Sequence, residues 1–153
     1  MYIKIILLFG MLFCHIVDDY YLQGILSSMK QKSWWKQNAP DKLYSKDYIM
    51  ALLEHAFSWT FMIMIIPVLY TMHSTNYITE IMIIIFFIIN MIIHAIIDNL
   101  KANKLSINLI EDQIVHIIQI FMTWVIFVFL KSCKNKKKYD IGYIPISYFL
   151  SVI

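Results

Sequence analysis

The sequence predicts an all-α integral membrane protein: a bundle of four transmembrane helices with a short basic, amphipathic C-terminal tail. Of the 153 residues, 60% are hydrophobic and only 15% are charged, whereas soluble domains carry about 25% charged residues. In addition, four apolar runs are each long enough to cross a hydrocarbon core about 30 Å thick. We therefore expect a single domain over 1–153 with the lipid bilayer as its first partner.

The four predicted helices cover residues 2–26, 48–72, 78–100 and 109–130. The first lacks a small-x-small cleavage site, so we expect it to remain as a helix rather than to be removed as a signal peptide. The polar stretch after it contains Trp34 and Trp35 between lysines, which is typical of a chain in the headgroup layer. The predicted tail, 131–153, ends in thirteen mostly apolar residues, too few to span a bilayer.

Positive charge is concentrated in one part of the chain. The net charge of +3 rests on thirteen lysines, because the sequence contains no arginine, and five of them lie between Lys131 and Lys138. This cluster indicates a juxtamembrane segment that favours anionic headgroups. Nucleic-acid binding typically uses arginine and a basic face on a soluble fold, so we expect no nucleic-acid partner. Seven lysines on one predicted side and six on the other leave the sidedness open.

Polar residues inside the predicted helices repeat one arrangement. The first, third and fourth helices each carry a histidine and an aspartate one turn apart, and the second carries a histidine. Cβ atoms at this spacing lie about 5–6 Å apart, so both side chains reach one cation or one orients the other. The candidate metal ligands are His15, Asp19, His55, His94, Asp98, Asp112 and His116.

These candidates lie toward one membrane face, although successive helices run in opposite directions. They fall late in the first and third helices and early in the second and fourth, whereas the remaining histidine, His73, lies in the opposite turn. An aspartate at the centre of a membrane helix costs roughly 2.5–3.5 kcal/mol, and facing carboxylates repel. A divalent cation relieves both penalties, and imidazole with carboxylate suits zinc, iron or manganese. We predict a divalent metal site, most simply for Zn²⁺.

Neighbouring polar residues receive other interpretations. A single histidine–aspartate pair would be explained more simply as a hydrogen bond between helices, and only the repetition at one depth favours a metal. Asp18, Glu54 and Glu111 are interpreted as wet interface residues. Gln23 and Gln113 are interpreted as hydrogen-bond donors that support the ligands.

The pattern also extends beyond the ligands. It reads His15-x-x-x-Asp19-x-x-x-Gln23, then tryptophan and lysine, His55, His94-x-x-x-Asp98-x-x-Lys101, and Asp112-Gln113-x-x-His116. Over roughly 2–130 it resembles a family of small uncharacterised membrane proteins of bacteria and phages, and it is distantly similar to predicted membrane-bound metal-dependent hydrolases. The stretch from Gln23 to the double tryptophan is longer than in that family, and the basic tail is outside the pattern. The resemblance implies a multi-pass protein of the bacterial inner membrane with a metal site.

The leading functional hypothesis is a membrane-embedded metal-dependent hydrolase. One or two divalent ions would activate water for attack on an ester or phosphoester, with Asp19, Asp112 and His116 as candidate catalytic residues for proton transfer. Because the site lies just inside one face, the expected substrate is a lipid or a lipid-linked group.

Three alternatives stay open at this point. The first is a non-enzymatic phage-type membrane protein, such as a holin or an exclusion factor, which the small size and lysine-rich tail fit. The second is an ion or proton carrier, because intramembrane histidine and aspartate also build relays. The third is a di-iron oxidase. The oligomeric state is also left open.

Overall fold

The computed structural model describes residues 2–71 and 77–140 and confirms the all-α class, with no strand in that part of the chain. Four helices are long and apolar enough to cross a membrane. They are α1 (Tyr2–Val17) with its π-helical extension η1 (Asp18–Leu22), α4 (Asp47–Thr71), α5 (Tyr77–Ala102) and α6 (Leu109–Asp140). The polar stretch after η1 forms three short helices: α2 (Leu26–Met29), α3 (Lys32–Asn38) and the 3-10 helix η2 (Lys42–Tyr44).

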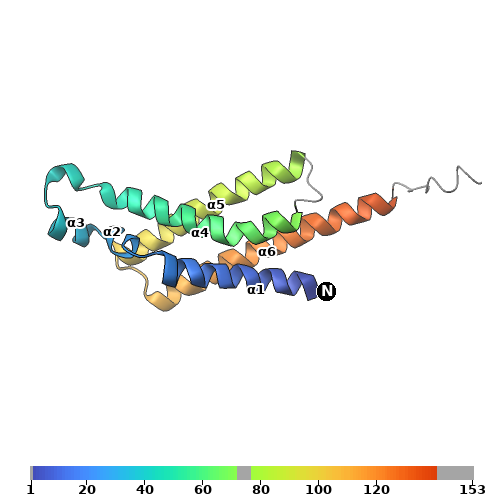
Figure 1. Ribbon diagram of the computed structural model, residues 1–153, viewed down its shortest axis with the longest axis horizontal. Coiled ribbons are helices and arrows are strands. Elements are labelled where there is room, and N and C mark those ends of the chain that lie inside the picture. Colours follow the sequence, from blue (N-terminus) through green and yellow to red (C-terminus); the bar gives the residue numbers. More distant parts are fainter. Residues whose placement is uncertain (1, 72–76, 141–153) are drawn as a thin grey trace, which may run out of the picture.

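The long helices lie side by side in an elongated bundle (Figure 1). The connection from α1 to α4 and the loop from α5 to α6 are at the same end of this bundle (Figure 1), which we call the connection end. The last turns of α1 and α5 and the first turns of α4 and α6 therefore meet there. This topology confirms the expectation that the polar residues share one depth.

The first helix ends earlier than predicted, at Leu22 rather than near residue 26. The backbone N–H of Gln23 bonds to the carbonyl of Asp18 at 3.1 Å, which is the five-residue spacing of a π-helical turn. Gly24 then adopts a φ of +48°, a left-handed conformation that glycine tolerates and that ends a helix. The chain is thereby directed into α2, which packs against α4.

The fourth helix begins where predicted and ends later. Asn108 Oδ1 accepts the backbone N–H groups of Ile110 and Glu111, while Glu111 Oε2 accepts the N–H of Asn108, as in a capping box. The helix then continues past residue 130 to Asp140, because lysine sustains a helix and no glycine or proline interrupts this segment. The apolar end of the predicted tail, 141–153, lies outside the described residues.

An apolar core fills the bundle on the side away from the connection end. Met11, Ile63, Met64, Ile120 and Phe127 are at most 2% exposed and form one cluster with Trp59. Each of them lies farther from the connection end than the candidate histidine ligand on the same helix. The candidate ligands thus have an apolar layer between them and the opposite membrane face.

A group of three polar side chains joins α5 to α6 on the side of the candidate ligands away from the connection end. Gln119 Nε2 donates to both the backbone oxygen and the side-chain oxygen of Asn90, each at 2.8 Å. Asn90 Nδ2 in turn donates to Thr123 Oγ1 at 3.1 Å. All three side chains are buried, so their mutual hydrogen bonds take the place of bonds to water, although Gln119 Oε1 has no partner among the described residues.

Replacing Asn90 by leucine is expected to lower the free energy of unfolding by about 1–3 kcal/mol, because the amide of Gln119 loses a buried acceptor. Unfolding of the purified protein in mixed detergent micelles measures this difference. The matched control is Ile89→Leu at the neighbouring exposed position, which should unfold as the wild type does. Equal stability of the two variants would contradict a stabilising role for the contact.

Candidate metal centre

The structure brings all seven predicted ligands into one cluster near the connection end. Each long helix contributes, since the cluster draws on α1 with η1, α4, α5 and α6. Six of the side chains are at most 3% exposed: His15, His55, His94, Asp98, Asp112 and His116. The Asp19 side chain is 9% exposed and reaches the edge of the cluster.

His55 stands at the centre of the arrangement. Its Nε2 atom lies 3.1 Å from His94 Nε2, 3.5 Å from Asp19 Oδ1 and 3.4 Å from Asp98 Oδ2. Ligands of a tetrahedral ion with bonds of about 2.0–2.1 Å lie about 3.3 Å from one another. The donor atoms of Asp19, His55 and His94 lie within 4.8 Å of one another, close enough to share one ion, and Asp98 Oδ2 reaches the same nitrogen of His55.

A second group of donors, from His94, Asp98 and His116, adjoins the first through His94. His116 Nε2 lies 3.6 Å from Asp98 Oδ1 and 3.3 Å from Asp112 Oδ1, so the two oxygens of Asp98 face different histidines. Among the described residues, neither nitrogen of His116, nor Asp112 Oδ1, nor Asp19 Oδ1 has a hydrogen-bond partner. Buried polar atoms without a partner cost about 1–3 kcal/mol each, and a cation would satisfy several of them together.

His15 was predicted as a metal ligand, but both of its ring nitrogens contact side chains from other helices. Its Nδ1 accepts the indole N–H of Trp59 at 2.8 Å, and its Nε2 faces the amide oxygen of Gln113 at 3.1 Å. The amide nitrogen of Gln113 donates to Asp19 Oδ2 at 3.2 Å, so its oxygen is left for His15 and Nε2 of that ring carries the proton. With both nitrogens engaged, His15 orients Gln113 and, through it, Asp19.

The interpretation of Asp18 as a wet interface residue is wrong. Its side chain is 1% exposed, accepts the hydroxyl of Ser58 at 2.5 Å and lies 3.5 Å from His55 Nδ1. The π-helical turn is the reason, because its wider spacing lets the consecutive Asp18 and Asp19 both face the bundle. A carboxylate on the far nitrogen of a histidine fixes that ring and raises its basicity toward a metal.

The other supporting residues lie largely where expected. Glu54 and Glu111 are exposed, whereas Gln23 Nε2 lies 2.9 Å from His55 Nε2 and Gln113 contacts Asp19. Trp59 was not predicted: its ring stacks on His94 with centroids 4.2 Å apart, and its N–H holds His15. Its position one turn after His55 on α4 is a signal that sequence reasoning could have used.

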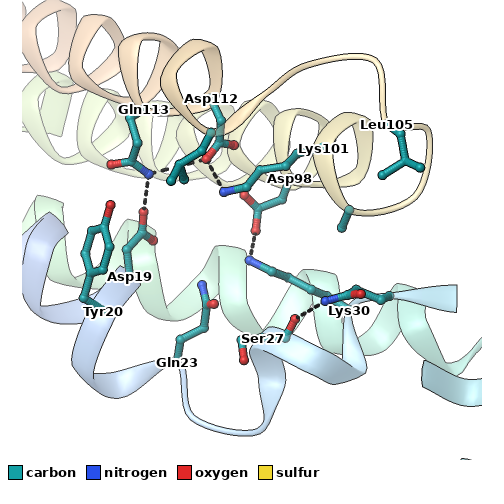
Figure 2. Close-up of a pocket in the computed structure, with 13 residues that line it drawn as sticks. Asp19, Tyr20, Gln23, Ser27, Lys30, Asp98, Lys101, Leu105, Asp112 and Gln113 are labelled. Atoms are coloured by element: carbon teal, nitrogen blue, oxygen red, sulfur yellow. Dashed lines mark hydrogen bonds and ion pairs between the residues drawn. The ribbon is translucent and has the colours of Figure 1, made fainter. Parts of the chain in front are cut away.

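Two lysines enter the cluster from its open side. Lys30 Nζ donates to Asp98 Oδ2 and Lys101 Nζ to Asp112 Oδ2, each at 2.6 Å, and Figure 2 shows both pairs. Lys101 belongs to the sequence motif, but Lys30 was counted only as a loop charge. It is 8% exposed because Asn103 binds its backbone oxygen at 3.0 Å and holds the connection against α5.

Charge in the cluster does not balance when the histidines are neutral. Four aspartates are buried or nearly so, namely Asp18, Asp19, Asp98 and Asp112, against the ammonium groups of Lys30 and Lys101. The remaining two negative charges in a membrane interior are costly unless a cation accompanies them. One divalent ion would supply the missing charge.

The cluster forms the floor of a pocket of about 310 Å³ at the connection end. Three aspartates, Asp19, Asp98 and Asp112, line this pocket together with Lys30 and Lys101, and Figure 2 shows them around one hollow. None of the histidines is among the lining residues. The site thus combines a polar mouth with a layer of buried imidazoles beneath it.

Comparisons of the chain with protein-family models, with curated proteins and with solved structures return no match. The family resemblance described above therefore stays a prediction, and functional inference rests on the geometry of the cluster.

Replacing Lys30 by methionine is expected to tighten the binding of a divalent ion by about tenfold, because an ammonium group and an ion compete for the same oxygen of Asp98. Titration of metal-stripped protein with Zn²⁺ measures the affinity. Lys36→Met removes an exposed lysine of α3 and serves as the control. Weaker binding by the Lys30 variant would show that the lysine supports the site instead of competing for it.

Proposed function

We propose that the protein is a membrane-embedded metal-dependent hydrolase that acts on an ester or phosphoester of a lipid or lipid-linked substrate. The observation that carries this proposal is the spacing of 3.1–3.5 Å between donor atoms around His55 at the floor of a polar pocket. Imidazole and carboxylate together form the ligand set of catalytic zinc sites and of iron or manganese sites. The proposal covers a divalent ion, with zinc as its simplest identity.

In this proposal some residues of the cluster bind the ion and others transfer protons. Asp19, His55, His94 and Asp98 would hold the ion, which supplies Lewis-acid polarisation of the scissile bond and of the attacking water. Asp18 and Trp59 keep the imidazoles in orientation through their contacts with His55 and His94. These contacts would keep the donor atoms in place without rearrangement during the reaction.

Asp112 and His116 form the proton-transfer pair of the proposal. Asp112 lines the pocket, Lys101 holds its Oδ2 atom, and its Oδ1 atom lies 3.3 Å from His116 Nε2. The pair would accept a proton from the attacking water and return one to the leaving oxygen, as general base and then general acid. Asp19, the third predicted catalytic residue, would serve in this proposal as a ligand, because its Oδ1 atom lies 3.5 Å from His55 Nε2.

A transmembrane carrier is less well supported by the geometry. A relay needs polar groups or water at every depth. The side chains that fill the bundle beyond the candidate ligands include Met11, Ile63, Met64 and Phe127, all nearly inaccessible. The polar contacts of Asn90 lie between the candidate ligands and this apolar core. A one-sided site suits chemistry at one membrane face.

The wild-type protein, purified in detergent, is expected to retain about one divalent ion per chain, and His94→Ala is expected to lose it because His94 belongs to both groups of candidate ligands. Elemental analysis by mass spectrometry measures the content. The control is the same substitution at His73, in the opposite turn of the sequence. Equal metal content in the two variants would rule out the proposed ligand set.

Asp112→Asn is expected to keep the bound ion and to lower the hydrolysis rate by about 10²–10⁴-fold, the usual contribution of a positioned general base. Release of product from ester and phosphoester lipids in detergent micelles, with ion content measured in parallel, provides the readout. Glu111→Gln changes the exposed neighbouring carboxylate and should keep full activity. Undiminished turnover by the Asp112 variant would remove it from the catalytic role.

A further inference from the structure

A second hollow, of about 560 Å³, adjoins the polar pocket. It lies between α1 with η1 and α6, and its walls include the apolar side chains of Leu12, Ile16 and Ile117. Tyr20 and Gln113 line both hollows. A charged chamber and an apolar groove therefore share a border formed by these two residues.

The apolar groove is open to the outside of the bundle, where candidate membrane spans would meet lipid. Ile16 is 47% exposed and Ile117 is 47% exposed, and both lie in segments that are long and apolar enough to span a membrane. A hydrocarbon chain would pass from the bilayer into this groove without crossing water. Because such a chain loses no apolar contact on the way, the groove suits an acyl chain better than a water-soluble ligand.

The polar pocket has the charge for an anionic group once an ion is bound. Its lining contains three carboxylates, those of Asp19, Asp98 and Asp112, and two ammonium groups, those of Lys30 and Lys101. Without an ion the carboxylates outnumber the ammonium groups by one, and a divalent cation on Asp19 and Asp98 reverses that sign. Lysine is a common partner of phosphate groups in proteins.

We propose that the substrate is an anionic phospholipid whose phosphate-bearing head occupies the polar pocket and whose acyl chain lies in the groove between α1 and α6. This inference rests on the proposed function and specifies its substrate class. Figure 2 shows Tyr20 next to Asp19 at the edge of the pocket, and Gln113 Nε2 donates to Asp19 Oδ2 at 3.2 Å. The linkage between head and chain would therefore lie beside the candidate metal ligands.

Binding of three probes to the purified full-length protein tests the inference. Dioctanoyl phosphatidic acid carries both head and chains, glycerol 3-phosphate carries the head alone, and dioctanoylglycerol carries the chains alone. The first is expected to bind about tenfold or more tightly than either of the others, because only it fills both hollows. Binding of glycerol 3-phosphate as tight as that of the lipid would overturn the inference.

A bulky substitution in the groove provides the matched variant. Ile117→Trp is expected to weaken binding of dioctanoyl phosphatidic acid by about tenfold, as the loss of contact with a few methylene groups would. Ile118→Trp places the same ring on the neighbouring lipid-facing position, which is 55% exposed and outside the groove, and should bind as the wild type does. Ile16→Trp fills the groove from its other wall and should repeat the effect of Ile117→Trp.

Ion content measured on the same samples separates the two proposals. If an ion is bound but the groove variants bind the lipid as well as Ile118→Trp does, the lipid site is overturned and the metal centre stands. If no ion is bound, the hydrolase is overturned, and a loss of affinity confined to the groove variants would then support the acyl-chain groove alone.

Discussion

The burial of four carboxylates among four imidazoles in the interior of a membrane bundle is the constraint on which the rest of the structure depends. Charge in such a layer is tolerated only where an opposite charge or a full set of hydrogen bonds accompanies it. The lysines at 2.6 Å from Asp98 and Asp112 supply part of this compensation. A cation held by the donor atoms of Asp19, His55 and His94, which lie within 4.8 Å of one another, would supply the rest.

The local folding of the chain serves this layer. The π-helical turn of η1 directs two consecutive aspartates inward, and Gly24 then lets the chain turn so that Lys30 reaches Asp98. The capping box at Asn108 fixes the start of α6, which places Asp112 and His116 in its first two turns. Beneath them, Trp59 forms the boundary between the polar layer and the apolar core.

The helices could be predicted from the sequence because hydropathy is a sum over neighbouring residues. The shared depth of the site followed because successive membrane spans run in opposite directions. His94 and Asp98 were identified from their one-turn spacing, and His55 from its depth in the predicted helix. Asp18 was misjudged because its orientation depends on a π-helical turn that no periodicity reveals. Lys30 was missed because its contact depends on the path of the connecting segment, and its sequence surroundings resemble those of the other loop lysines.

The supporting part of His15 likewise depends on tertiary contacts. Its spacing from Asp19 is that of a ligand pair, yet the indole of Trp59 and the amide of Gln113 engage both of its nitrogens. Spacing along a helix therefore identifies which side chains meet, whereas the partners from other helices decide which of them can bind an ion.

X-ray absorption spectroscopy of the purified protein at the edge of its bound metal tests the central claim most directly. The account predicts a shell of nitrogen and oxygen atoms at about 2.0–2.1 Å, with the outer scattering of about two imidazole rings. A shell made of oxygen atoms alone, without imidazole scattering, would contradict it.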